Sequence, residues 1–317
     1  MQSGPTTRKN HIPGYGAVAL ASCIWGTGFY FGRLALNEMG VEHMVLYRFA
    51  FATLAMLPIL LRRWRELRLT ASEFRTLLIS ATLGIPVQFL IQFHGLARTT
   101  VSHAALMVGT LPVLLALTAT LFGGERLDRI GWGLLWLSTL GAAMVTLGGT
   151  HGKAAQGEPT LLGDLLVVFS LLTSLVWIML NKKLMQRHSP EVVSALTILC
   201  GSLLLAAWVL GPWLLRLQAA PPPFAQLSRT AWLALAASGI LCSGATTLLW
   251  NWGIHHVPAS RAGVFLNIEP AMGSFLGVEL LGEHLGPFAW IGGLLILGAA
   301  LALTARSHSP EPEIILE

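Results

Sequence analysis

The sequence predicts an all-α polytopic membrane protein with ten transmembrane helices, built as two inverted five-helix repeats. Hydrophobic residues make up 54% of the chain and charged residues only 11%, whereas a soluble domain carries about 25% charged residues. Ten apolar segments each have about the 20 residues that cross the core of a bilayer. A motif in residues 95–135 recurs in residues 253–293. Because each half holds five spans, the second copy enters the membrane in the opposite direction.

The apolar segments are expected to be helices, because they are too long and too uniformly apolar for the alternating strands of a barrel. Arg8 and Lys9 precede the first segment as in a signal peptide, but the uncharged run continues to Gly32 and is long enough to span. The expected helices of the first half are 12–32, 43–61, 76–97, 100–123 and 130–150. Those of the second half are 163–181, 190–212, 230–252, 258–281 and 287–305.

The segments divide into two predicted domains, one repeat each, at 12–150 and 163–305, followed by a tail at 306–317. With the N-terminus inside, fourteen Lys and Arg residues lie on the inner side and six on the outer side. An excess of Lys and Arg marks the cytoplasmic side. We therefore expect both termini and the tail in the cytoplasm, and the protein in the plasma membrane, which is the inner membrane of a bacterium.

Two prolines and two glutamates recur in the repeated motif and are predicted to have structural roles. Pro112 corresponds to Pro270, and each should kink its helix by removing a backbone hydrogen bond. Glu125 corresponds to Glu283, and each follows a glycine suited to a left-handed helix end. We interpret both glutamates as turn and capping residues, so no catalytic carboxylate pair is expected.

Four short motifs follow one another along the chain. They are Ile24-Trp25-Gly26, Tyr47-Arg48-Phe49, Thr110-Leu111-Pro112 with Gly124-Glu125-Arg126-Leu127, and Ile268-Glu269-Pro270 with Gly282-Glu283-His284-Leu285. In this order they resemble the EamA type of the drug/metabolite transporter superfamily, and the resemblance covers about residues 12–305. The resemblance implies a ten-helix fold and export of small molecules, such as amino acids or other metabolites, from the cytoplasm.

Glu269 is the predicted proton-coupling residue, and the chain departs from a perfect repeat here because Leu111 occupies the matching position. A carboxyl group in apolar surroundings can exchange a proton near neutral pH. The competing interpretation is a structural hydrogen bond just before the Pro270 kink. The sequence leaves both interpretations open.

Polar and aromatic side chains near helix centres are the predicted substrate contacts, because polar groups there usually face a cavity or each other. Arg48 and Arg261 could attract a substrate carboxylate, although arginines near helix ends also extend to the membrane interface. His103 could titrate near neutral pH or hydrogen-bond at the interface. The predicted substrate-binding residues are Trp25, Tyr47, Arg48, Gln88, Gln92, His103, Asn251, Trp252, Arg261, Phe265 and Asn267.

These observations favour a secondary transporter working by alternating access over an enzyme or a nucleic-acid-binding protein. No cofactor or metal is predicted, since the three cysteines lie in apolar segments and no phosphate-binding glycine loop is present. The Lys and Arg residues responsible for the net charge of +5 lie in short loops between apolar segments, which is not the pattern of a basic nucleic-acid-binding face. An intramembrane enzyme would need paired groups, yet His103 and His94 lack acidic neighbours and Asp164 stands alone in the sequence.

Three alternatives remain open at this point. The protein could be a facilitator or exchanger without proton coupling, an intramembrane enzyme, or a membrane sensor that would need an output domain larger than the loops. The expected partners are a small-molecule substrate and the lipid bilayer, and a homodimer is left open.

Overall fold

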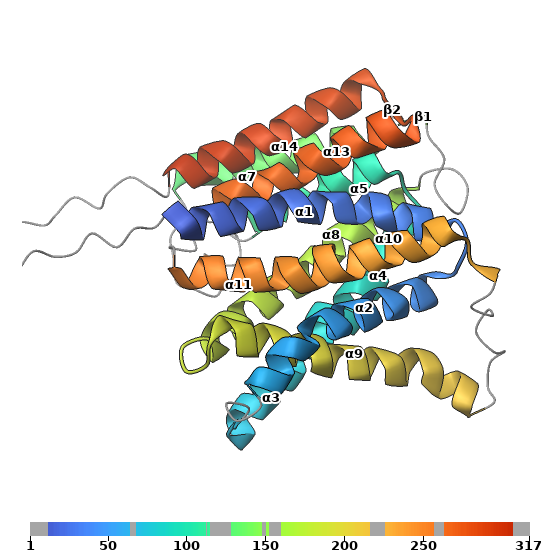
Figure 1. The fold of residues 1–317 in the computed structure, drawn as a ribbon. Coiled ribbons are helices and arrows are strands. Elements are labelled where there is room, and N and C mark those ends of the chain that lie inside the picture. Colours follow the sequence, from blue (N-terminus) through green and yellow to red (C-terminus); the bar gives the residue numbers. More distant parts are fainter. Residues whose placement is uncertain are drawn as a thin grey trace, which may run out of the picture.

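A computed structural model describes residues 12–63, 68–111, 113–114, 128–147, 150–151, 160–215, 226–256 and 263–306, which form a bundle of helices (Figure 1). In the first half, the elements are α1 (Ile12–Leu36), α2 (Val41–Arg62), α3 (Ala71–Thr82), a π-helical turn η2 (Leu83–Val87), α4 (Gln88–Ala97), α5 (Val101–Val108) and α7 (Arg129–Leu147). In the second half, they are α8 (Leu161–Leu184), α9 (Pro190–Leu214), α10 (Arg229–Gly239), a π-helical turn η4 (Ile240–Ala245), α11 (Thr246–His256), a 3-10 turn η5 (Gly263–Asn267), α13 (Ile268–Leu281) and α14 (Pro287–Arg306).

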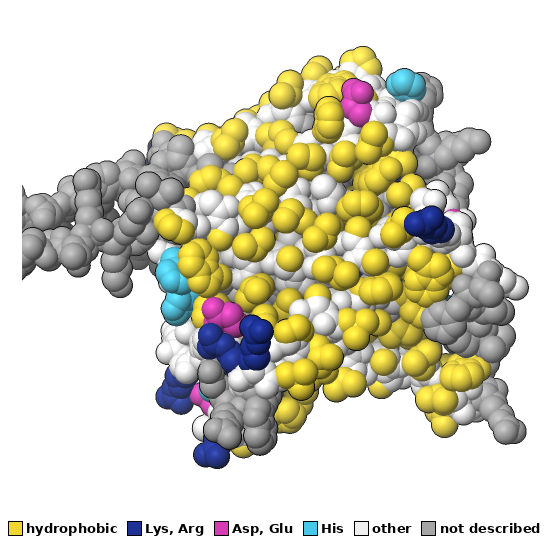
Figure 2. Space-filling view, in the orientation of Figure 1, with side chains coloured by type: hydrophobic (Ala, Val, Ile, Leu, Met, Phe, Trp, Pro, Cys, Tyr) yellow, Lys and Arg dark blue, Asp and Glu magenta, His cyan; other side chains and the backbone are white. Residues whose placement is uncertain are grey.

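The surface of the bundle suits a bilayer. Among the described residues, five helical runs are long and apolar enough to cross a membrane, and they are Val41–Arg62, Ala71–Ala97, Leu161–Leu184, Pro190–Leu214 and Arg229–His256. Large apolar side chains face outward along them, including Trp208 on α9, which is 70% exposed. On the face drawn in Figure 2, hydrophobic side chains cover the middle, and most charged side chains lie toward the helix ends.

Capping residues explain why some helices begin earlier than the apolar pattern predicts. Thr70 accepts a hydrogen bond from the Glu73 backbone N–H, and the Glu73 carboxylate accepts one from the Thr70 backbone N–H. This capping box starts α3 ahead of the predicted segment 76–97.

The left-handed end predicted for the helix before Glu283 is observed. Gly282 ends α13 with φ of 65°, a conformation that a residue without Cβ adopts readily.

Two short strands add an element that the sequence did not predict. β1 (Thr150–His151) pairs in antiparallel fashion with β2 (His284–Leu285). The predicted helix 130–150 therefore ends in the described structure at Leu147, the last residue of α7. The two strands join the segments that follow α7 and α13, which belong to different halves of the chain.

The contacts of Thr99 show that the two halves run in opposite directions. Arg33, near the end of α1, donates hydrogen bonds to the backbone oxygens of Leu96 and Thr99. Asp164, in the first turn of α8, accepts a hydrogen bond of 2.5 Å from the Thr99 hydroxyl. The first helix of one half thus ends where the first helix of the other half begins. This is the arrangement of an inverted repeat.

Matching glycines set the register between the halves. α4 packs on α8, and α11 packs on α1. A Cβ atom on Gly95 would lie 2.7 Å from the carbonyl oxygen of Gly163, and one on Gly253 would lie 3.1 Å from that of Gly14. Both pairs bring two helix backbones into close contact, which only a residue without Cβ allows. Gly14 therefore corresponds to Gly163, just as Gly95 corresponds to Gly253.

The two π-helical turns also occupy matching positions. η2 interrupts the run from α3 to α4, and η4 interrupts the run from α10 to α11 at the corresponding place. Pro86 lies inside η2 and cannot donate a backbone hydrogen bond. Such turns are frequent at functional sites because they redirect the side chains around them. Here both turns contribute residues to the centre of the bundle.

Candidate functional site

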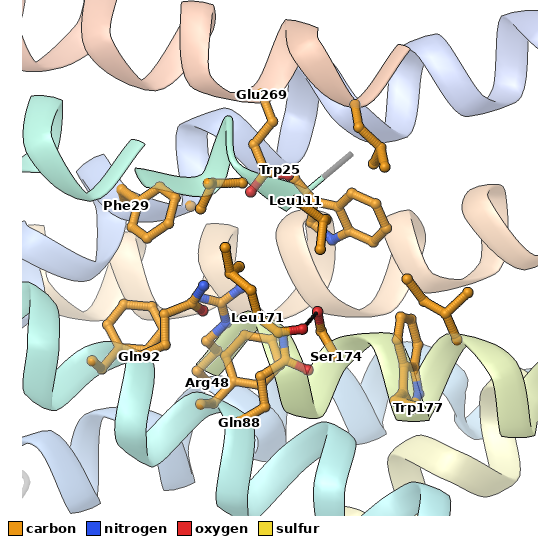
Figure 3. A pocket seen from close by; sticks show the side chains of 16 residues that line it. Trp25, Phe29, Arg48, Gln88, Gln92, Leu111, Leu171, Ser174, Trp177 and Glu269 are labelled. Carbon is orange, nitrogen blue, oxygen red and sulfur yellow. Dashed lines mark hydrogen bonds between the residues drawn. The ribbon is translucent and has the colours of Figure 1, made fainter. Parts of the chain in front are cut away.

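A cavity lies at the centre of the bundle, between the two halves. In Figure 3, Arg48, Gln88 and Gln92 lie on one side of it, and Glu269 and Trp25 lie on the other. Helices of both halves contribute to its wall. The lining residues are Trp25, Gly28, Phe29, Arg48, Gln88, Phe89, Gln92, Phe93, Val108, Leu111, Leu171, Ser174, Trp177, Ile178, Leu266 and Glu269.

The cavity is built from corresponding positions of the two repeats. In the register set by the glycine contacts, Trp25 corresponds to Ser174, Gly28 to Trp177 and Phe29 to Ile178, and all six line the cavity. In the register of the repeated motif, Val108 corresponds to Leu266 and Leu111 to Glu269. The repeats therefore share the wall positions but not the side chains on them. The cavity is symmetric in backbone and asymmetric in chemistry.

A second lobe adjoins the first and shares Trp25, Gln88, Phe89 and Trp177 with it. Its remaining wall comes from α2, from the two π-helical turns, and from α9 and α11. Thr197, which corresponds to Arg48 in the second repeat, lines this lobe. The residues of this lobe that are not part of the first are Phe49, Gly84, Ile85, Thr197, Ile198, Cys242, Ser243 and Thr247.

The Arg48 guanidinium is held firmly in the wall and is only 3% exposed. Its Nε donates a hydrogen bond of 2.7 Å to the Ser243 hydroxyl, and Nη2 donates one of 3.3 Å to the backbone oxygen of Cys242. The rings of Phe89 and Phe93 lie 4.8 and 5.1 Å from its central carbon. Such cation–π contacts are strongest away from water. Arg48 is therefore a buried cavity residue and does not extend to the membrane interface.

Three other polar groups of the cavity have no partner among the described residues. The Glu269 carboxylate takes part in no hydrogen bond or ion pair there, and the side-chain amides of Gln88 and Gln92 form none either. Arg48 Nη1 likewise has no hydrogen-bond acceptor in the described part of the chain. Buried polar groups are normally hydrogen-bonded. Unpaired groups that converge on one cavity are typical of a binding site.

The carboxylates at one end of the bundle are paired, in contrast to the Glu269 carboxylate of the cavity. We call this the Glu283 end, where α1 and α4 end and α5 and α8 begin. The Glu283 carboxylate accepts hydrogen bonds of 2.7 Å from the backbone N–H groups of Val101 and Ser102. It thus caps the first turn of α5, where a negative charge is favoured. Glu283 is 3% exposed and joins the two halves.

Two histidines that the sequence left without acidic neighbours have them in the structure. His103 Nδ1 lies 3.4 Å from Asp164 Oδ2, and both side chains are buried. His94 Nε2 lies 3.1 Å from Glu42 Oε1. The expectation that Asp164 stands alone is therefore wrong. His103 and Asp164 come from different halves, so their contact adds to the closure of the Glu283 end.

The remaining predicted substrate-binding residues lie away from the cavity lining. Tyr47 packs on Trp232, with ring centroids 5.5 Å apart, and both line an apolar groove between α2, α9 and α10. Asn251 is buried and donates a hydrogen bond of 2.9 Å to the Ser194 hydroxyl. Trp252 lies beside the exposed His256, with centroids 4.2 Å apart.

Phe265 lies near the ring of Tyr15 at a centroid distance of 5.8 Å, and Asn267 is buried at the start of α13. Pro270 is buried in α13, close to the position of Gly109. Arg261, Pro112 and Glu125 lie outside the described residues.

Sequence reasoning missed several cavity residues, most notably the aromatic rings of Phe89 and Phe93 around Arg48. Both flank the predicted pair Gln88 and Gln92 in the sequence. An arginine near an aromatic-rich helix was the available signal, but the pairing of α2 with α4 was not known from the sequence. Ser243 was missed because it lies within η4, where the helical period changes.

Comparison with known proteins identifies the class. The model of the EamA-like transporter family matches residues 12–147 and 161–305. The chain therefore belongs to the EamA-like transporter family and is an integral membrane protein, not an enzyme.

Relatives match over nearly their whole length. An uncharacterized transporter of Archaeoglobus fulgidus is 24% identical over 95% of this chain and 99% of its own. A biotin transporter of Salmonella typhimurium is 24% identical over 92% of this chain and 93% of its own. A probable terminal-alkyne amino-acid exporter of Streptantibioticus cattleyicolor is 23% identical with the same coverage. A crystal structure of a protein 19% identical has a TM-score of 0.64, covers 93% of this chain and 99% of its own, and supports the fold.

Proposed function

We propose that this protein is a secondary transporter that exports small metabolites, such as amino acids or other amphipathic compounds, by alternating access. Energy comes from a proton gradient, with Glu269 as the proton-coupling residue. The protein lies in the plasma membrane, the inner membrane in a bacterium, with both termini in the cytoplasm. The units that move against each other are the repeats at 12–150 and 163–305, and the tail at 306–317 is cytoplasmic.

The observation that carries this proposal is the central cavity with its unpaired polar groups. It lies between the two halves, where a rocking movement would expose it to either side. Its aromatic and apolar wall suits the body of an organic molecule, and its few polar groups suit a charged or hydrogen-bonding head. The polar contacts at the Glu283 end support a state closed at that end, because they tie the halves together there.

The names of the relatives support small organic substrates but differ from each other, one naming biotin and one naming an amino acid. The main alternative is a facilitator or exchanger that moves substrate down its own gradient. It is favoured if Glu269 only stabilises the start of α13, where its charge lies in the first turn.

Counterflow in proteoliposomes tests the proposal. Purified protein is reconstituted and loaded with members of a panel of amino acids, nucleosides and amphipathic drugs, with and without an imposed pH gradient. Exchange that a pH gradient accelerates supports a proton-coupled transporter. Exchange that is indifferent to the gradient supports the facilitator. The absence of exchange across the panel, with folded protein in the liposomes, contradicts both.

A further inference from the structure

Arg48 is a basic residue and Glu269 an acidic one, and the two line the same cavity from different halves of the chain. Each acts electrostatically on the other. Nevertheless, neither takes part in an ion pair within the described residues. Two separated charges in an apolar interior are costly unless something completes their interactions. The arrangement calls for a ligand that lies between them.

The structure keeps Arg48 from moving across the cavity to Glu269. Ser243 and the Cys242 carbonyl hold two of its nitrogens, and two phenyl rings flank it. The remaining nitrogen, Nη1, has no acceptor among the described residues. Gly28 leaves space beside it, since a Cβ there would still lie 3.8 Å from Nη1. A guanidinium N–H that the protein leaves without an acceptor can donate a charge-assisted hydrogen bond to a carboxylate oxygen.

The geometry points to a zwitterion as the substrate class, with its carboxylate on Arg48, its ammonium group on Glu269, and its apolar body against Trp25 and Trp177. This inference rests on the proposed transport function and specifies its substrate. A zwitterion pairs both charges of the cavity at once. A simple carboxylate leaves Glu269 without a partner, and a simple amine leaves Arg48 without one. Either mismatch leaves a buried charge uncompensated.

The same geometry determines whether proton and substrate move in the same or in opposite directions. A proton on Glu269 removes the negative charge that binds the ammonium group, so proton and substrate compete for one carboxylate. Among the described residues, Arg48 on α2 is the charged group that acts on Glu269, and Glu269 in turn acts on the Cys242 thiol of η4. Of the helices packed on α13, α5 carries His103, which faces Asp164 instead, and α1 places Gly26 beside the Glu269 backbone. Competition of this kind gives antiport, in which one proton enters for each zwitterion that leaves.

Matched probes test this inference, because each set differs only in its charged groups. The aromatic set is phenylalanine, 3-phenylpropionate and 2-phenylethylamine, and the aliphatic set is leucine, 4-methylpentanoate and 3-methylbutylamine. Each probe is tested as an inhibitor of substrate counterflow in proteoliposomes that contain the full-length protein or one of its variants. Glu269→Gln is the first variant, since the described carboxylate has no hydrogen bond to lose. Glu279→Gln is the control, since Glu279 is exposed on the same helix.

We expect the wild-type protein to bind at least one zwitterion about tenfold or more tightly than its two singly charged analogues, the factor of a single ionic contact. Lower pH should weaken zwitterion binding in the wild type and in Glu279→Gln. In Glu269→Gln, the preference for the zwitterion over the carboxylate should be lost, together with its pH dependence. Arg48→Lys should weaken binding of the zwitterion and of the carboxylate but not binding of the amine.

Two results would overturn the inference while leaving transport intact. One is exchange of panel compounds with no preference for a zwitterion, and the other is an unchanged preference in Glu269→Gln. The absence of exchange of any compound by the folded wild-type protein would instead contradict the proposed function. Thermal melting of each detergent-solubilised variant shows whether a lost activity reflects a lost fold.

Discussion

Two inward-facing carboxylates on neighbouring segments, Glu269 and Glu283, differ in that the second is paired and the first is not. Glu283 accepts two backbone hydrogen bonds at 2.7 Å and joins the halves. Glu269 faces the cavity with no partner among the described residues. A paired buried carboxylate stabilises a fold, whereas an unpaired one is retained at a cost in stability. Glu283 therefore has a structural role, whereas Glu269 lies in the cavity where a substrate binds.

The largest loss of stability is expected for Glu283→Gln. The amide can no longer accept a hydrogen bond from both Val101 and Ser102, and the charge at the start of α5 disappears. We expect the free energy of unfolding to fall by about 2 to 3 kcal/mol, measured by thermal or denaturant unfolding in detergent. Glu279→Gln is the control. If Glu283→Gln and Glu279→Gln had equal melting temperatures, Glu283 would not have the stabilising role assigned to it.

The glycine contacts sharpen the comparison by testing whether the halves are equivalent in packing. Gly95→Ala and Gly253→Ala each place a Cβ against a neighbouring helix. Both should lower the free energy of unfolding by about 1 to 3 kcal/mol through overpacking. Gly133→Ala has open space around its Cβ and should gain up to about 1 kcal/mol from helix propensity. If only one of the two contact variants is destabilised, the halves do not pack equivalently.

A smaller effect is expected at the surface of the Glu283 end. The Glu38 carboxylate accepts hydrogen bonds from the Ser228 hydroxyl and backbone N–H, at 2.5 and 2.8 Å, which lower the pKa of Glu38 below its usual 4.5. A lowered pKa in the folded state stabilises the protein above the unfolded-state pKa, and this contribution disappears as pH falls through the folded-state value. Between pH 7 and pH 3, the melting temperature of Glu38→Gln should therefore fall slightly less than that of the wild type. A steeper loss in the variant would contradict this assignment.

The helices and their duplication could be predicted from the sequence, because both depend on local patterns. The expected segment 190–212 is observed as Pro190–Leu214, and 43–61 as Val41–Arg62. The π-helical turns were not predicted, because an apolar run that contains one has the length and composition of a continuous α-helix. The strand pair was missed because each strand has only two residues.

The site was harder to predict, because it depends on contacts between distant helices. The spacing of Gln88 and Gln92 placed them on one helix face, and both line the cavity. The position of Arg48 toward one end of its helix suggested the interface, yet contacts with η4 of the other half hold it in the interior. No periodicity could bring His103 to Asp164, since each lies on a different helix.

The most direct test of the central claim is to measure Glu269→Gln and Glu283→Gln side by side for melting temperature and for the pH dependence of zwitterion counterflow. We expect Glu269→Gln to melt no lower than the wild type and to exchange substrate independently of pH. We expect Glu283→Gln to melt well below the wild type, while its folded fraction keeps the pH dependence of exchange. Destabilisation by Glu269→Gln with an unchanged pH profile would show instead that Glu269 is a structural residue.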